Sequence, residues 1–150
     1  MMANNNPLPV LTFLLGEQTY ALPILQVVEV AAMVEMTDLV NARAEVIGAA
    51  NRHGEVLPML DLCQVMGLER VEYDDDTLFI VAQNDDRTLC GLIVNTVQQV
   101  QHIGREHITT NAASAYIQGI STHHAQLIQI LDINAIMDAY LVRTHTVEGK

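Results

Sequence analysis

The chain has 150 residues, of which 50% are hydrophobic and 17% are charged, and its formal net charge is −11 at pH 7. This composition favours one compact domain and excludes an intrinsically disordered chain. Because binding to nucleic acids and to anionic membranes depends on Lys and Arg, the acidic balance excludes the first and argues against the second.

The ends of the chain and its cysteines bear on domain limits and compartment. We predict a disordered N-terminal tail over 1–8, one domain over 9–145 and a C-terminal tail over 146–150. No signal peptide is visible, and no uncharged apolar run approaches the ~18–20 residues of a membrane helix. Cys63 and Cys90 lie among apolar neighbours, which predicts reduced core thiols and a cytoplasmic protein without membrane insertion.

The first half of the chain predicts β-strands, because short runs of alternating or β-branched hydrophobic residues are separated by turn residues. These runs are 11–15, 20–24, 27–30, 45–52 and 55–60. Gly16 lies in a hairpin loop between the first two runs, and His53-Gly54 forms the turn between the last two. Pro58 predicts that its strand lies at a sheet edge or carries a bulge, whereas residues 33–45 are predicted to form a connection.

The second half predicts a similar series. Its strands are 77–81, 89–94, 96–103, 116–121 and 126–131. Two short helices are predicted, one between Asp61 and Gly67 and one over 133–141 after Asp132, because Asp begins helices well and Gly ends them. The acidic residues 69–76 are predicted to form a solvated loop. Many short strands with frequent turns predict an all-β barrel or sandwich with minor helices.

The two halves of the chain also share a pattern of residue spacings. Gly48 precedes Asp61 by 13 positions, and Gly119 precedes Asp132 by 13, at an offset of 71 residues. The earlier hairpins match at an offset of 69. We interpret this as two similar β units, each closed by a strand, an aspartate and a short helix. The alternative is one barrel with chance similarity.

No group of residues predicts catalysis. The chain lacks a Gly-x-Ser-x-Gly elbow and a Gly-rich phosphate loop, and its only lysine is Lys150. The six histidines include no His-Glu-x-x-His, and the adjacent His123 and His124 would face opposite sides of a strand. Asp61 and Asp132 are interpreted as helix caps rather than as a carboxylate pair. We therefore predict no enzyme activity, no metal and no cofactor.

Four blocks of the sequence resemble the CheW-like family of bacterial chemosensory adaptors. They are 11–30, 46–68, 77–100 and 116–137. The second block is the most specific, because a glycine, an Asn-x-x-Gly turn, a proline and Leu-Asp-Leu follow in fixed order. The resemblance implies an all-β fold of two five-stranded SH3-like β-barrels packed on a shared core, with short helices that include a C-terminal one.

The resemblance also implies a non-enzymatic adaptor that couples the cytoplasmic tip of a chemoreceptor to the regulatory domain of a CheA-like histidine kinase. A receptor helix would lie in an apolar groove between the barrels. Carried over by position, the partner-binding residues would be Val27, Glu29, Gly48, Arg52, His53, Gly91, Leu92 and Val94. For Val27, Leu92 and Val94 the alternative is core packing, and for Gly48 and Gly91 it is backbone geometry.

The turn departs from the family pattern. The family usually has Asn-Leu-Arg-Gly, whereas this chain has Asn51-Arg52-His53-Gly54. Neighbouring residues of a strand face opposite sides, so Arg52 is not expected to replace the family arginine, and His53 could pair with Glu29 only when protonated. Asn95 stands where the family has an aspartate. These departures suggest a specialised member, for example in a surface-motility or second-messenger pathway. The alternative from another class is a sensor that binds a small ligand between the barrels.

Overall fold

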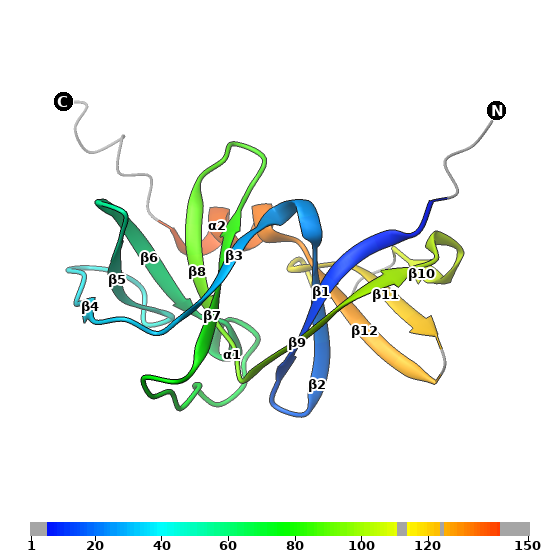
Figure 1. Ribbon diagram of the computed structural model, residues 1–150, viewed down its shortest axis with the longest axis horizontal. Helices are drawn as coiled ribbons and strands as arrows, with labels where there is room; N and C mark the ends of the chain where they lie inside the picture. Colours follow the sequence, from blue (N-terminus) through cyan, green and yellow to red (C-terminus); the bar gives the residue numbers. More distant parts are fainter. Residues whose placement is uncertain (1–5, 111–113, 124, 142–150) are drawn as a thin grey trace.

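The computed structural model describes residues 6–110, 114–123 and 125–141, and they are mostly β-strand (Figure 1). The longer strands are β1 (Leu8–Leu15), β2 (Gln18–Pro23), β3 (Val27–Ala32), β5 (Val46–Arg52), β6 (Glu55–Asp61), β7 (Leu78–Gln83), β8 (Leu89–Ile93), β9 (Thr96–Ile103), β11 (Ile117–His123) and β12 (Gln126–Leu131). The all-β prediction is therefore confirmed. β1 begins one residue inside the predicted N-terminal tail, and residues 1–5 and 142–150 lie outside the described residues.

Short elements join these strands. Two-residue strands are β4 (Met36–Thr37) and β10 (Ile108–Thr109), and the helices are η1 (Ile24–Gln26), α1 (Leu62–Val65), η2 (Arg105–His107) and α2 (Ile133–Tyr140). β4 lies in the segment predicted to be a connection, because two residues are too few to show a period. None of the helices in the described part of the chain is long and apolar enough to cross a bilayer.

The strands form two sheets of six. Sheet 1 has the order β10-β11-β12-β2-β1-β9, and sheet 2 has the order β4-β5-β6-β8-β7-β3. Each sheet therefore contains five longer strands and one two-residue strand, which matches the five strands expected for each barrel. The two sheets lie side by side with α2 near their junction (Figure 1).

The internal repeat is visible strand by strand. In the first half Val46 pairs with Leu60 and Gly48 with Met59, across a bulge. The same pairs recur 71 residues later, Ile117 with Leu131 and Gly119 with Ile130, again across a bulge. The interpretation as two similar units is thus confirmed, and chance similarity is excluded, because the register of the hydrogen bonds is shared.

Pro58 lies on a strand inside its sheet, since β6 has β5 on one side and β8 on the other. The pairing with β8 begins only at Met59, so Pro58 belongs to the half of β6 that pairs with β5 alone. This half has an open side. The missing N–H of proline is tolerated there as it would be at a sheet edge.

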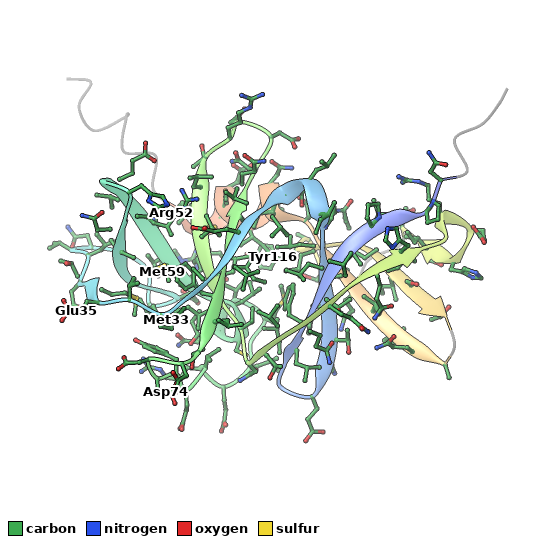
Figure 2. All side chains as sticks on the ribbon, viewed as in Figure 1. Met33, Glu35, Arg52, Met59, Asp74 and Tyr116 are labelled. Atoms are coloured by element: carbon green, nitrogen blue, oxygen red, sulfur yellow. The ribbon has the colours of Figure 1, made fainter. Side chains whose placement is uncertain are left out.

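The core is one large hydrophobic cluster with contributions from both sheets. It includes Phe13 and Leu22 of sheet 1 and Leu60 and Leu92 of sheet 2, together with Ile136 of α2. Side chains fill the space between the two ribbons in Figure 2. A smaller cluster in sheet 1 is formed by Val10, Ala21, Ile103, Ile128 and Ile130. The shared core fixes the two sheets against each other.

Candidate functional site

An ion pair joins two of the predicted partner-binding residues. Arg52, the last residue of β5, donates from Nε to Glu29 Oε2 of β3 over 2.7 Å. The exposed fractions of the two side chains are 21% for Arg52 and 38% for Glu29. Figure 2 shows Arg52 beside the β5–β6 hairpin. The pair links the edge strand β3 to a strand that is far from it in the order of sheet 2.

Arg52 pairs with Glu29 although the strand alternation had predicted that His53 and not Arg52 would face this acid. His53 and Gly54 have positive φ values of 55° and 85°, so they form the two-residue turn of a hairpin. The Gly54 N–H donates to Asn51 Oδ1 over 2.9 Å and fixes this turn. His53 is therefore a turn residue and not a strand residue. The strand alternation that guided the expectation ends at Arg52.

A surface depression of about 260 Å³ surrounds this pair. Its lining combines the charged pair and His53 with small and apolar side chains. The lining residues are Glu29, Ala31, Val34, Ala50, Asn51, Arg52, His53, Leu57 and Phe79. The structure thus brings three of the predicted site residues, Glu29, Arg52 and His53, to one surface, and this surface has an apolar floor and a polar rim.

The two predicted glycines lie inside the sheet. A Cβ at Gly48 would come within 3.0 Å of the Thr37 carbonyl oxygen and 3.2 Å of Met36 Cβ. A Cβ at Gly91 would overlap Met59 Sδ and lie 3.2 Å from Phe79 Cδ2. Both glycines are buried. Close approach between strands accounts for them, which is the backbone alternative.

For Leu92 and Val94, predicted to contact a partner, the structure favours the alternative of core packing. Both side chains have no exposed surface, and both belong to the large core cluster. A residue with no accessible surface cannot contact a partner in this conformation. Val27 is half-buried and packs against the same cluster, so core packing explains much of its role as well.

The exposed apolar residues of β3 were missed. Val28 and Val30 are each 38% exposed, and they alternate with Val27, Glu29 and Ala31 along the strand. β3 is an edge strand, so a second partner strand is absent on one side among the described residues. Valine occurs on both faces of the run Val27–Val30, so the sequence pattern could not show which face is buried and which is exposed.

The buried polar groups have structural roles. Asp61 Oδ1 accepts from Gln64 N at 3.2 Å, and Asp61 Oδ2 accepts from Val71 N at 2.9 Å. Burial raises the pKa of Asp61, and it also raises the pKa of Cys63 and takes that of Cys90 to about 12. Both cysteines are therefore protonated thiols near neutral pH. In the part of the chain that the structure describes, no three His, Cys, Asp or Glu side chains are grouped as metal ligands.

A pocket of about 420 Å³ lies beside α1 and bears on the ligand-sensor alternative. Its lining includes the charged Glu69, Arg70 and Glu72. The Asn95 Oδ1 atom in it already accepts from Gly16 N over 2.6 Å and from Cys63 Sγ over 3.1 Å. Charged side chains thus form much of this lining and Asn95 Oδ1 is already paired, which does not favour the ligand-sensor alternative.

Comparison with known proteins agrees with this geometry. The family model described as CheW-like domain matches residues 9–140. Chemotaxis protein CheW of Klebsiella aerogenes is 26% identical over 135 residues, which cover 86% of this chain and 81% of that protein. Protein PilI of Pseudomonas aeruginosa is 32% identical over 90 residues, which cover 60% of this chain and 50% of PilI.

Among solved structures, the scaffolding protein TtCheW from Thermoanaerobacter tengcongensis matches with a TM-score of 0.77 and 26% identity. The match covers 84% of this chain and 89% of TtCheW, and it confirms the expected pair of SH3-like barrels with minor helices. The family match extends over most of the chain and includes both sheets. The chain therefore belongs to the CheW-like family.

Proposed function

We propose that this chain is a non-enzymatic adaptor in a chemosensory complex, where it acts in the cytoplasm as a scaffold between a chemoreceptor tip and a CheA-like histidine kinase. The observation that carries the proposal is the match to the CheW-like family over residues 9–140. The names of the relatives, chemotaxis protein CheW and scaffolding protein TtCheW, support the same role. Phosphoryl transfer belongs to the kinase in this proposal.

The surface proposed for partner binding is the depression around Glu29 and Arg52. The lining of this depression includes the apolar side chains of Ala31 and Phe79. It also includes the partly exposed ion pair and His53. Apolar anchors with a few polar rim groups suit a protein partner. Val28 and Val30 alternate with Glu29 and Ala31 along β3, so they lie on the other face of this edge strand and are not part of the depression. Leu92 and Val94 are not part of this proposed surface.

A co-sedimentation assay tests the function. Receptor cytoplasmic fragments on vesicles are mixed with the kinase and with this chain, and the pellet is analysed for all three proteins. We expect the chain to enter the pellet with receptor-bearing vesicles and not with bare vesicles, and to bring the kinase into the pellet with it. Failure of the wild-type chain to join the complex at tens of micromolar would contradict the adaptor role.

A matched pair of variants tests the surface. Glu29→Lys inverts the charge in the depression and breaks the pair with Arg52, whereas Glu17→Lys makes the same change in the exposed β1–β2 turn of sheet 1. We expect Glu29→Lys to reduce co-sedimentation with at least one partner and Glu17→Lys to leave it unchanged. Equal binding by both variants would move the partner surface elsewhere while leaving the adaptor role intact.

A further inference from the structure

The two sequence repeats do not correspond to the two sheets. We define repeat 1 as residues 8–65, from β1 to the end of α1, and repeat 2 as residues 78–140, from β7 to the end of α2. β1 and β2 of repeat 1 lie in sheet 1, but β3 to β6 lie in sheet 2. β7 and β8 of repeat 2 lie in sheet 2, but β9 to β12 lie in sheet 1.

Each repeat inserts its first hairpin into the sheet of the other. In sheet 1 the β1–β2 hairpin lies between β9 and β12, both from repeat 2. In sheet 2 the β7–β8 hairpin lies between β3 and β6, both from repeat 1. Figure 1 shows the blue β1–β2 hairpin beside the yellow-green β9 and the orange β12, and the green β7–β8 hairpin beside the blue β3 and the teal β6.

The exchange is reciprocal in its hydrogen bonds. In both sheets the hairpin makes one parallel ladder, Ile128 to Ile130 with Thr19 to Ala21 in sheet 1 and Met59 to Asp61 with Gly91 to Ile93 in sheet 2. In both sheets it makes one antiparallel ladder, β1 with β9 and β3 with β7, and each of these ladders has a bulge. Such equal pairing on both sides is the arrangement of a strand-exchanged dimer.

Side chains strengthen the contact between the repeats. Thr12 Oγ1 of β1 donates to the Gln99 carbonyl oxygen of β9 over 2.9 Å, and Gln129 Nε2 donates to Gln18 Oε1 over 3.0 Å. The hairpin residues Phe13, Ile80 and Leu92 have no exposed surface. Without the other repeat these residues would be exposed, and β9 would lose its only ladder among the described residues.

The connection between the two repeats takes no part in the strand pairing of either sheet. Residues 72–76 are exposed, and hydrogen bonds hold the chain on both sides of them: Val71 N donates to Asp61 Oδ2, and Met33 N donates to the Thr77 carbonyl oxygen. No strand of either sheet lies between Val65 and Leu78. The connection is therefore a tether rather than a part of either sheet.

We propose that the surface between the two repeats is a complete assembly interface, and that the partner it fits is the complementary repeat, from the same chain or from a second copy of it. Neither repeat forms a sheet with its full set of strands alone. A chain cut in the connection keeps its fold as a two-piece complex, and the pieces can be exchanged between copies.

The experiment uses the full chain with a protease recognition sequence inserted between Asp75 and Asp76. After folding, the chain is cut and melted at several concentrations. Because a two-piece complex loses about 1.4 kcal/mol of stability on each tenfold dilution, the melting temperature falls by about 3–6 °C per tenfold dilution. The control carries the same sequence after Lys150, and its melting temperature is independent of concentration after cutting.

Exchange between copies is tested with isotopically heavy and light cut chains that are mixed, warmed to the melting range and cooled. Native mass spectrometry is expected to find hybrids as about half of the complexes. Two separately folded pieces, one folded and one unfolded piece, or a concentration-independent melt would overturn the proposal.

Hydrogen exchange on the uncut, unmodified chain gives a second readout, which does not depend on the insertion. We expect amides of β1 and β2 to exchange through the same global opening as those of β7 and β8. Two distinct opening free energies, one for each repeat, would contradict the proposal.

Discussion

Asp61 and Asp132 cap equivalent helices at positions 71 residues apart, but among the residues that the structure describes only Asp61 holds a second backbone segment. Asp61 Oδ1 accepts from Gln64 N over 3.2 Å, and Asp132 Oδ1 accepts from Ala135 N over 3.1 Å. Asp61 Oδ2 also accepts from Val71 N over 2.9 Å. The two repeats thus have the same helix cap. In the first repeat, the other carboxylate oxygen of the cap also anchors the connection that leads to the second repeat.

This difference predicts unequal costs for removing the two caps. Asp132→Ala leaves one backbone N–H without its partner, and we expect a loss of about 1 kcal/mol in the free energy of unfolding. Asp61→Ala also leaves the buried Val71 N–H unpaired, which adds about 1–3 kcal/mol. Urea unfolding of both variants measures the difference. Equal losses would contradict an anchoring role for the second oxygen of Asp61.

The pH dependence of stability gives a separate prediction. Burial raises the pKa of Asp61 above its usual value of 3.8, so the folded state holds this proton more tightly than the unfolded state. The stability that the proton contributes is present below the unfolded-state pKa and is lost as pH rises through the folded-state pKa. Asp61→Asn cannot ionise and lacks this loss. Relative to the variant, the wild type should lose stability as pH rises above 3.8 and through the higher folded-state pKa.

Two unfolding curves measured across that pH range check the prediction, because the other acidic groups are common to both proteins and cancel in the difference. One unit of pKa shift corresponds to about 1.4 kcal/mol of difference. Parallel pH profiles of wild type and Asp61→Asn would show that Asp61 titrates alike in the folded and unfolded states.

Local patterns in the sequence predicted the strands, the helix caps and the repeat, because each of these depends on neighbours in the chain. The exchange of hairpins between repeats could not be predicted, since a repeat has the same pattern whether its hairpin pairs within its own half or with the other. For the same reason, the sequence could not show that Leu92 and Val94 are fully buried. Their hairpin β7–β8 is inserted between β3 and β6, so β8 lies inside the sheet, and both residues have no exposed surface.

The ion pair of the candidate site was missed for a different reason. The expectation depended on where the strand ends, and a one-residue shift of the turn decides whether Arg52 or His53 faces Glu29. His53 has a left-handed backbone with φ 55°, a conformation that no hydrophobic pattern signals. By contrast, Glu29 and the turn from Asn51 to Gly54 were predicted to lie near partner contacts, and they do lie together around one depression.

A double-mutant cycle tests the close packing at Gly91. An added Cβ would overlap Met59 Sδ in a buried site, so Gly91→Ala should reduce stability by about 1–3 kcal/mol. Met59→Ala removes the obstructing side chain and has its own cost of about 2–5 kcal/mol. We expect the double variant to cost less than the sum of the two, as measured by denaturant unfolding. Additive costs would show that Met59 does not set the need for glycine.

Truncation of Leu92 and truncation of Val30 should reduce stability by different amounts. Leu92 is fully buried, so Leu92→Ala should lower the free energy of unfolding by about 2–5 kcal/mol. Val30 is 38% exposed on the edge strand, and Val30→Ala should cost about 1 kcal/mol or less. Thermal melts and co-sedimentation of both variants separate the two roles. A stable Leu92→Ala protein with weak partner binding would return Leu92 to the binding surface.

The pair formed by Glu29 and Arg52 should contribute modestly to stability. Its atoms lie 2.7 Å apart, but both side chains keep contact with solvent, and exposed pairs couple by about 0.2–1 kcal/mol. A double-mutant cycle with Glu29→Gln and Arg52→Gln measures the coupling in the free energy of unfolding. The pair of Arg43 and Glu45, 3.9 Å apart with Arg43 55% exposed, is the matched comparison.

We expect a smaller coupling for Arg43 and Glu45 than for Glu29 and Arg52. Breaking the pair of Glu29 and Arg52 should also reduce partner binding more than breaking the pair of Arg43 and Glu45. The charge-swapped variant with Glu29→Arg and Arg52→Glu sharpens the test, because it can restore the pair without restoring the charges that a partner meets. Recovered stability with weak co-sedimentation would assign the charges to partner recognition. Recovery of both would assign the pair to holding β3 against the β5–β6 hairpin, and the partner would then contact the apolar side chains of the depression.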